Sequence, residues 1–318
     1  MELLNIEKLK MYYGIMRGEV KAVDDVSFKL NKGESLGLAG ESGCGKTSVA
    51  LCILRLLPRN GRIVGGKINF EGKDLTEMKY NEFRREIAWK KISVIFQGAM
   101  NALHPTKDIG SQITEAIITH ENVGKKEALD RTKELLDLVG IGASRHNRFP
   151  HELSGGMKQR TMIAMALACN PNLIIADEPT TALDVIVQTQ VLKVIEELQR
   201  KLSLSMLLIS HDLSVIAETC NKVGIMYAGK IVEHGDIVSV FKETLHPYTK
   251  KLIGAFPSVL GSRTALTSIH GFPPDLLNPP SGCRFHPRCT NAMEVCKKEE
   301  PPTIEASKEH YVACHLIS

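Results

Sequence analysis

Short apolar runs and helical patterns alternate along the chain. Residues 35–39 (SLGLA) form a continuous run of apolar and small residues, a glycine-rich stretch follows, and apolar residues then recur at helical spacing from Lys46 onwards. This order predicts a buried strand over 35–39, a loop, and a helix that begins near Lys46.

The same order of elements returns in the second half of the chain. Residues 171–179 (PNLIIADEP) and 205–212 (SMLLISHD) are apolar runs that end in polar residues, which is typical of central strands in a parallel sheet covered on both faces. The helical pattern over 185–202 completes a β-α-β unit between them. We therefore expect an α/β protein.

Two other regions have patterns of their own. Residues 3–13 and 21–30 are strand-like, whereas residues 98–150 are richer in helical patterns and suggest a helical insertion. The clearest of these, 125–140, ends on a glycine suited to a helix C-cap.

Composition and charge add limits rather than a function. Apolar residues make up 43% of the 318 positions, the formal net charge is +4, and Lys and Arg are scattered among acidic residues. No apolar run reaches the roughly 20 residues of a spanning helix, and the first residues lack the layout of a signal peptide. We expect a water-soluble cytoplasmic chain, and the charge pattern does not favour nucleic-acid binding.

The glycine-rich stretch carries the clearest chemistry. Residues 40–47 (GESGCGKT) fit the pattern G-x-x-x-x-G-K-[ST] between a predicted strand and a predicted helix, as a phosphate-binding P-loop requires. Backbone N–H groups would face the phosphates, Lys46 would reach the β and γ phosphates, and the Thr47 hydroxyl would bind Mg²⁺. The predicted ATP-binding residues here are Gly40, Ser42, Gly43, Cys44, Gly45, Lys46, Thr47 and Ser48.

Two further segments supply groups that suit a nucleotide. Asp177 and Glu178 end the strand-like run, where Asp177 would hold the Mg²⁺ hydration shell and Glu178 would orient or deprotonate the attacking water. In LSGGMKQR, Ser154, Gly155 and Gly156 combine a helix N-cap hydroxyl with bare backbone amides at a helix N-terminus, which is also the geometry of an anion site.

With these residues the chain resembles the ATP-binding subunits of ABC transporters. LSGGMKQR resembles their signature motif, and the order of P-loop, glutamine, signature, acidic strand and histidine is preserved. The resemblance implies an α/β P-loop NTPase (ABC ATPase) core with a helical subdomain at about 98–160 and an N-terminal antiparallel β subdomain, over residues 1–255. A small Cys-rich C-terminal extension would occupy 256–318.

The resemblance also assigns roles to single residues. It makes Gln97 a ligand of Mg²⁺ and water, and His211 the switch residue that contacts the γ-phosphate. Tyr13 would stack on adenine, with Tyr12 as the alternative. Ala182, Leu183 and Asp184 would form the D-loop at a dimer seam. The implied catalytic set is Lys46, Gln97, Glu178 and His211.

The family pattern further implies partners. Each P-loop is completed by the signature motif of a second ATPase subunit, identical or different, and the pair docks beneath two transmembrane permease subunits. The helical insertion near 98–120 would contact the permease, which places the chain peripherally on the cytoplasmic face of the membrane.

The tail narrows the family. Residues 241–257 and 271–289 resemble the C-terminal extension of ATPases that drive dipeptide and oligopeptide importers, with nickel importers as close relatives. This implies peptide uptake, with an extracytoplasmic peptide-binding protein as an indirect partner. The alternatives are a nickel importer ATPase and a DNA-repair ATPase of ABC type. The short spacing between P-loop and signature leaves no room for the long coiled coil of the latter.

Cysteines separate into two groups. Cys44, Cys52, Cys169 and Cys220 are dispersed and are expected to be buried thiols, whereas Cys283, Cys289, Cys296 and Cys314 are clustered behind a stiff Pro- and Gly-rich linker. The gaps between the clustered four are five, six and seventeen residues. Structural zinc usually uses C-x₂₋₄-C pairs, so a [4Fe-4S] cluster is favoured over zinc, with unligated thiols as a third possibility. The resemblance also associates a four-cysteine iron-sulfur site with this extension.

Overall fold

The computed structural model describes residues 1–98, 102–181, 183–255 and 269–317. The chain divides into two compact units. The first unit comprises Met1–Leu30, Ser35–Thr76 and Ile209–Ser318, and the second comprises Asn31–Glu34 and Glu77–Leu208. Each unit is described by itself.

The first unit begins with a four-stranded sheet in the order β2-β1-β4-β5. Its strands are β1 (Glu2–Ile15), β2 (Gly18–Asn31), β4 (Gly61–Phe70) and β5 (Lys73–Asp74). β4 pairs antiparallel with both β1 and β5. The N-terminal antiparallel β subdomain is thereby confirmed.

A second sheet of the first unit carries the strand that precedes the P-loop. Its strands are β3 (Ser35–Ala39), β9 (Lys222–Tyr227), β10 (Lys230–Asp236), β11 (Thr303–Ser307) and β12 (His310–Ala313). They lie in the order β11-β12-β10-β9-β3, in which β3 and β9 are parallel and the other pairs antiparallel. All five residues of β3 are buried, as the sequence predicted.

Short helices accompany this sheet. They are α1 (Lys46–Leu54), α7 (Leu213–Thr219), α8 (Ile237–Lys242), α9 (Pro247–Gly254), α10 (Glu294–Lys298) and the 3₁₀ turn η4 (His286–Arg288). α7 packs tightly on β3, because a Cβ added to Gly37 would lie 2.4 Å from the Ile216 side chain. α1 begins at Lys46, where the sequence placed a helix start.

The second unit holds the acidic strand and the four longest of the described helices. Its elements are α2 (Tyr80–Glu86), β6 (Ile92–Ile95), α3 (Ile109–His120), α4 (Lys125–Leu138), η2 (Ala143–Arg145), η3 (Pro150–Glu152), α5 (Gly155–Ala166), β7 (Leu173–Asp177), α6 (Val185–Leu202) and β8 (Ser205–Ile209). The strands run in the order β8-β7-β6, and β6 and β7 are parallel.

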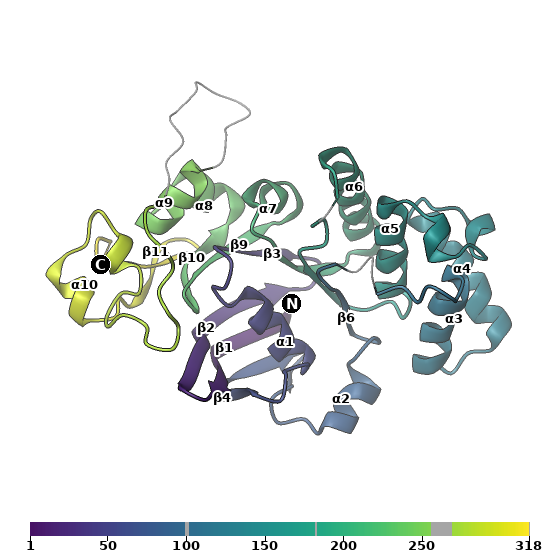
Figure 1. The fold of residues 1–318 in the computed structure, drawn as a ribbon, viewed down its shortest axis with the longest axis horizontal. Coiled ribbons are helices and arrows are strands. Elements are labelled where there is room, and N and C mark those ends of the chain that lie inside the picture. Colours follow the sequence, from purple (N-terminus) through teal and green to yellow (C-terminus); the bar gives the residue numbers. More distant parts are fainter. Residues whose placement is uncertain (99–101, 182, 256–268, 318) are drawn as a thin grey trace. The chain divides into compact units, whose positions relative to one another are not determined.

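Three helices form the helical part of the second unit. α3 contacts α4, and both contact α5 (Figure 1). The Thr114 and Thr132 hydroxyls meet 3.0 Å apart in the buried contact between α3 and α4. After α4, Gly140 has a φ of 72°, which confirms the predicted glycine stop. Within the described part of the chain, no helix is long and apolar enough to cross a membrane.

Candidate nucleotide-binding site

The P-loop follows β3, and two of its glycines are required by close backbone contacts. Gly40 and Gly45 have φ values of 147° and 104°. A Cβ on Gly40 would lie 2.1 Å from the Met226 carbonyl oxygen, and one on Gly45 would lie 2.1 Å from that of Ala22. Only glycine fits both positions, so the loop keeps its tight turn and its amides stay uncovered by side chains.

Lys46 is held inside this loop. The residue is only 6% exposed, and its Nζ donates hydrogen bonds to the carbonyl oxygens of Gly40 (2.7 Å) and Glu41 (3.1 Å). The ammonium group also lies 3.6 Å from Cys44 Sγ. Burial raises the pKa of the Cys44 thiol, and Lys46 partly opposes this rise. The Lys46 ammonium group therefore lies in the loop where a phosphate would bind.

The structure distinguishes the two tyrosine candidates. The Tyr13 hydroxyl lies 3.1 Å from Ser48 Oγ on α1, whereas the Tyr12 hydroxyl donates to Asp24 Oδ1 at 3.0 Å. Burial, followed by the Asp24 carboxylate, raises the pKa of Tyr12 to about 12. Tyr13 thus lies beside the P-loop helix, which favours it as the adenine-stacking residue.

Glu178 is held in place by two donors in the second unit. Gln97 Nε2 donates to Glu178 Oε2 at 2.8 Å, and Thr181 Oγ1 donates to the same oxygen at 3.0 Å. Glu178 has a φ of 47°, in the left-handed region that is uncommon for a residue with a side chain. Asp177 beside it is 4% exposed at the end of β7. The structure thus brings Gln97 to the end of the acidic strand.

The signature segment forms a capped helix start. Ser154 Oγ accepts a hydrogen bond from the Met157 N–H at 3.3 Å as the N-cap of α5. Gly156 faces α6, because a Cβ there would lie 2.5 Å from the Val187 side chain. In this unit Asp184 caps α6 by accepting from the Val187 N–H at 2.9 Å. Ala182, also predicted for the D-loop, lies outside the described residues.

The predicted nucleotide residues fall into two groups. Tyr13, residues 40–48 and His211 belong to the first unit, and His211 is exposed after β8. Gln97, Asp177, Glu178, the signature segment and Asp184 belong to the second.

The four clustered cysteines are neighbours in the first unit. Burial raises the pKa of Cys283 to about 11, and negative charge on Cys296, Cys314 and Cys289 raises it further. The pKa values of Cys289 and Cys314 are raised likewise by burial and by thiols of this group. However, the described residues contain no group of three or more His, Cys, Asp or Glu that could hold a metal ion. The metal site therefore stays a prediction.

The four dispersed cysteines are buried, as expected. Cys44, Cys52, Cys169 and Cys220 are free thiols. Burial raises the pKa of Cys52 and of Cys220 to about 12, so both stay protonated at neutral pH.

Sequence reasoning missed the polar contacts that fasten the C-terminal segment, residues 269–317, to the rest of the first unit. Glu233 and His310 form a buried pair at 2.9 Å, and the Glu233 carboxylate also accepts from the N–H groups of Leu245 and His246. Arg284 pairs with Asp24, and Arg288 with Glu41. In the sequence Arg284 follows Cys283 and Arg288 precedes Cys289. This adjacency to the clustered cysteines was the signal by which sequence reasoning could have singled out the two arginines.

Comparisons with known proteins agree with this geometry. Residues 23–181 match the family described as ABC transporter, and residues 232–296 match the C-terminal region of oligopeptide/dipeptide transporters. The chain is 46% identical to the oligopeptide transport ATP-binding protein OppD of Bacillus subtilis, over 99% of the chain and 89% of that protein. It is 42% identical to the dipeptide transport ATP-binding protein DppD of Escherichia coli, over 99% and 97%.

Solved structures support the fold. The ATP-binding cassette MJ0796, in a dimeric post-hydrolysis state bound to ADP and Pi, matches with a TM-score of 0.66 and 23% identity over 74% of this chain and 99% of that chain. At that identity the likeness concerns the fold alone. The matched regions and the relatives together show that the chain belongs to the ATP-binding proteins of the oligopeptide and dipeptide ABC transporter family.

Proposed function

We propose that the chain is the ATP-hydrolysing motor subunit of an importer for dipeptides or oligopeptides. The observation that carries this is the P-loop between β3 and α1, with Lys46 buried inside it, in a chain whose relatives are named for peptide transport. The motor would act on membrane partners, and the described part of the chain holds no helix long and apolar enough to cross a membrane.

The residues divide the reaction between them. On ATP binding Lys46 leaves the Gly40 and Glu41 carbonyl oxygens for the β and γ phosphates, and the free amides of the loop bind the same anion. Glu178, held by Gln97, orients the attacking water and takes its proton. His211 contacts the γ-phosphate. Thr47, Gln97 and Asp177 would hold Mg²⁺, which would neutralise charge on the phosphates.

A second ATPase subunit completes each site. Ser154, Gly155 and Gly156 of one chain would face the nucleotide on the P-loop of the other. Val185 and Ile186, at the start of α6 beside Asp184, are 78% and 73% exposed. Two bulky apolar side chains exposed to solvent at the start of α6 are consistent with a dimer interface that covers them. The partner is another copy or a related ATPase.

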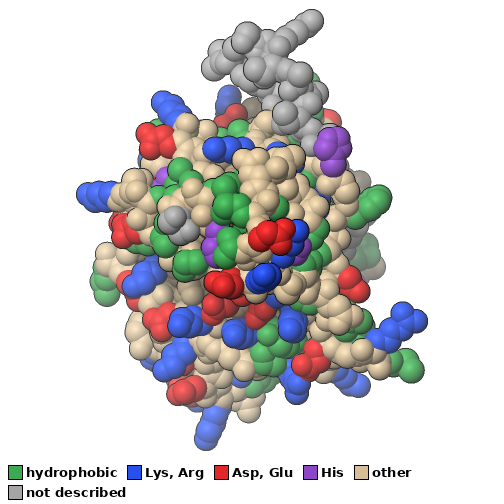
Figure 2. All heavy atoms as spheres, turned by 90° about the vertical axis from the view of Figure 1, so that its left-hand side faces the viewer, with side chains coloured by type: hydrophobic (Ala, Val, Ile, Leu, Met, Phe, Trp, Pro, Cys, Tyr) green, Lys and Arg blue, Asp and Glu red, His purple; other side chains and the backbone are tan. Residues whose placement is uncertain are grey.

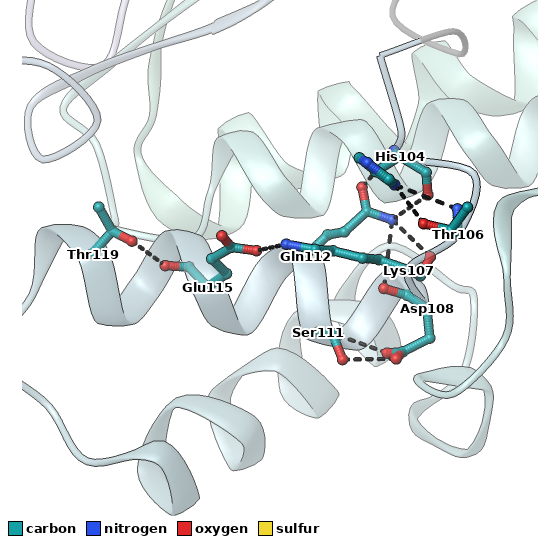
Figure 3. A network of polar contacts seen from close by, with 8 residues as sticks. All are labelled: His104, Thr106, Lys107, Asp108, Ser111, Gln112, Glu115 and Thr119. Atoms are coloured by element: carbon teal, nitrogen blue, oxygen red, sulfur yellow. Dashed lines mark hydrogen bonds and ion pairs between the residues drawn. The ribbon is translucent and has the colours of Figure 1, made fainter.

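The permease subunits would contact the segment at the start of α3. There Gln112 accepts from the His104 N–H at 2.8 Å and donates to the Lys107 carbonyl oxygen at 3.0 Å (Figure 3). Lys107 pairs with Glu115 at 2.6 Å, beside a hollow of about 550 Å³. A surface loop fixed by this many bonds is preorganised for a partner, which supports docking at the cytoplasmic face of the membrane.

The C-terminal extension would hold a [4Fe-4S] cluster on Cys283, Cys289, Cys296 and Cys314. Negative charge on neighbouring cysteines of this group helps to raise the pKa values of Cys283, Cys289 and Cys314, although the described residues contain no group of three or more His, Cys, Asp or Glu that could hold a metal ion. The gaps of five, six and seventeen residues between these cysteines suit a cluster whose irons stand apart better than they suit the closely spaced pairs of structural zinc. The four thiolates would anchor the irons, and the cluster would supply a rigid cross-link or an electron-accepting centre.

The alternatives are weaker. A nickel importer ATPase would have the same motor, but the OppD and DppD relatives are named for peptides. A DNA-repair ATPase should present a basic surface, whereas Figure 2 shows Lys and Arg interspersed with Asp and Glu on the face it draws.

Reconstitution tests the proposal. The chain is purified with the membrane proteins that accompany it and placed in vesicles with the extracytoplasmic binding protein. We expect Mg²⁺-dependent hydrolysis that rises when peptide is added, together with peptide uptake. Stimulation by Ni²⁺ instead of peptide would support the nickel alternative, and stimulation by DNA would contradict both importers.

A further inference from the structure

Glu41, the second residue of the P-loop, is fixed through all three of its polar groups. Its N–H donates to the Tyr248 hydroxyl oxygen at 3.0 Å. Its carbonyl oxygen accepts from Lys46 at 3.1 Å. Its carboxylate accepts two hydrogen bonds from Arg288, at 2.6 and 2.9 Å. The loop is therefore joined at one residue to α9, to its own lysine and to the C-terminal segment.

Arg288 is built into the C-terminal segment as a rigid group. Its side chain is 6% exposed, and its guanidinium also donates to the carbonyl oxygens of His270 (2.9 Å) and Gly271 (3.1 Å). It lies 3.3 Å from the Tyr227 hydroxyl and 5.7 Å from the centre of that ring. The bidentate pair with Glu41 and these further contacts leave the Arg288 guanidinium little freedom to move.

Aromatic packing holds the neighbourhood of Arg288 in place. Phe285 lies one turn before it and packs edge-on against Tyr227, with 5.1 Å between ring centres. Tyr248 packs against both rings, at 4.7 Å from Tyr227 and 5.3 Å from Phe285. All three side chains are fully buried. The segment thus cannot move Arg288 without disturbing this cluster.

The charge of Glu41 makes this contact consequential for nucleotide binding. A carboxylate in a loop that receives a triphosphate repels it, and only a nearby cation removes that repulsion. Lys46 donates to the backbone carbonyl oxygens of Gly40 and Glu41, whereas the cation that pairs with the Glu41 carboxylate is Arg288. The Glu41–Arg288 pair also fixes the backbone of Glu41, whose carbonyl oxygen accepts a hydrogen bond from Lys46.

We propose that Arg288 is a positioning residue for ATP binding, by which the C-terminal segment neutralises Glu41 and sets the geometry of the P-loop. This rests on the proposed ATPase function. The C-terminal segment would then influence ATP affinity directly. Any change that shifts Arg288, which is next to Cys289 in the sequence, would change the affinity of the P-loop for ATP. The segment is then a part of the ATP-binding apparatus and not only a family-specific appendage.

A charge-removal series tests it. Arg288→Gln leaves the Glu41 carboxylate unpaired, and we expect the KM for MgATP to rise about tenfold with kcat nearly unchanged. Arg288→Lys should recover part of the loss. Adding Glu41→Gln to Arg288→Gln removes the unpaired charge and should restore the KM towards that of the unaltered protein.

Glu300→Gln is the matched control. It breaks the Lys230–Glu300 ion pair, which also joins the C-terminal segment to the sheet but does not touch the P-loop. We expect its KM to be unchanged. Thermal unfolding of every variant separates lost fold from lost affinity.

The outcomes are distinct. If Arg288→Gln and Glu300→Gln have the same KM, or if the double variant binds ATP no better than Arg288→Gln, the inference is wrong. If Arg288→Gln does not fold, the single variant Glu41→Gln provides the test. It should bind ATP at least as tightly as the unaltered protein, and its ATP affinity should depend less on salt concentration. Weaker ATP binding by Glu41→Gln would contradict the inference. Failure of the unaltered protein to bind MgATP would instead contradict the proposed function.

Discussion

The Gln97 side-chain amide donates a 2.8 Å hydrogen bond to the Glu178 carboxylate, joining the segment after β6 to the residue after β7. The parallel register of these strands, in which Ile95 faces Ala176, brings both segments to the same edge of the sheet. Because Thr181 donates to the same oxygen, the carboxylate is oriented before any nucleotide arrives. A base that is held in advance loses little freedom during the reaction.

Glu178→Gln should therefore abolish turnover while it preserves ATP binding. The amide keeps the size of the side chain but cannot accept a proton from water, so we expect kcat to fall about 10²- to 10⁴-fold. Phosphate release measures turnover, and a fluorescent ATP analogue measures binding. Glu197→Gln, at an exposed pair with Lys201 on α6, is the control and should change neither. Unimpaired hydrolysis in Glu178→Gln would remove Glu178 as the catalytic carboxylate.

Gly45→Ala should damage the P-loop far more than Gly43→Ala. Both positions have positive φ, 104° and 79°, so each alanine is strained by about 1–2 kcal/mol. A Cβ on Gly45 would in addition overlap the Ala22 carbonyl oxygen, whereas one on Gly43 has no atom within 4 Å. We expect denaturant unfolding to show the larger loss for Gly45→Ala, together with weaker ATP binding. Equal losses would mean that strain alone, and not the close contact, requires Gly45.

Local sequence patterns predicted much of the fold. The strand over Ser35–Ala39, the helix from Lys46 and the helix over Val185–Leu202 were all found where the sequence placed them, because burial and helical spacing are properties of one segment. β11 and β12 were missed for a physical reason. β12 pairs with the distant β10, and β11 pairs with β12. Most of β11 is exposed, so it has no pattern of buried positions that a sequence could reveal.

Polar contacts between distant segments were the other gap. The Glu41–Arg288 pair joins residues 247 positions apart, and the buried Glu233–His310 pair joins residues 77 apart. A charged side chain in a Pro-rich tail looks like a solvated one until the fold places its partner beside it. Motif order could indicate which residues meet the nucleotide, but it gave no information on what holds the motif.

Acidification should destabilise the first unit through His246. Its ring is buried, and burial lowers its pKa from 6.5 to about 3. The unfolded chain therefore binds a proton that the folded chain does not, so stability is full above pH 6.5 and falls by about 1.4 kcal/mol per pH unit below it, until about pH 3. Nδ1 accepts from the Tyr248 N–H at 3.0 Å, which also requires an unprotonated nitrogen.

His246→Asn tests the origin of this pH dependence. Asparagine keeps an acceptor at the N-cap of α9 but does not titrate. Unfolding free energies measured by denaturant at pH 7, 6 and 5 should fall less steeply for the variant than for the unaltered protein. Parallel curves would show that other groups control acid stability.

Anaerobic purification should yield a brown protein with about four irons and four sulfides per chain. Cys283→Ser, Cys289→Ser, Cys296→Ser or Cys314→Ser should each lower the iron content, because a missing corner ligand exposes one iron to water. Cys52→Ser is the matched control, since Cys52 is a buried thiol on α1, and it should keep the full iron content. Stoichiometric zinc without iron would replace the cluster by a zinc site, and a metal-free protein that folds normally would leave four plain thiols. Either result would leave the roles proposed for Lys46, Glu178 and His211 standing, because none of these three residues is a proposed ligand of the cluster.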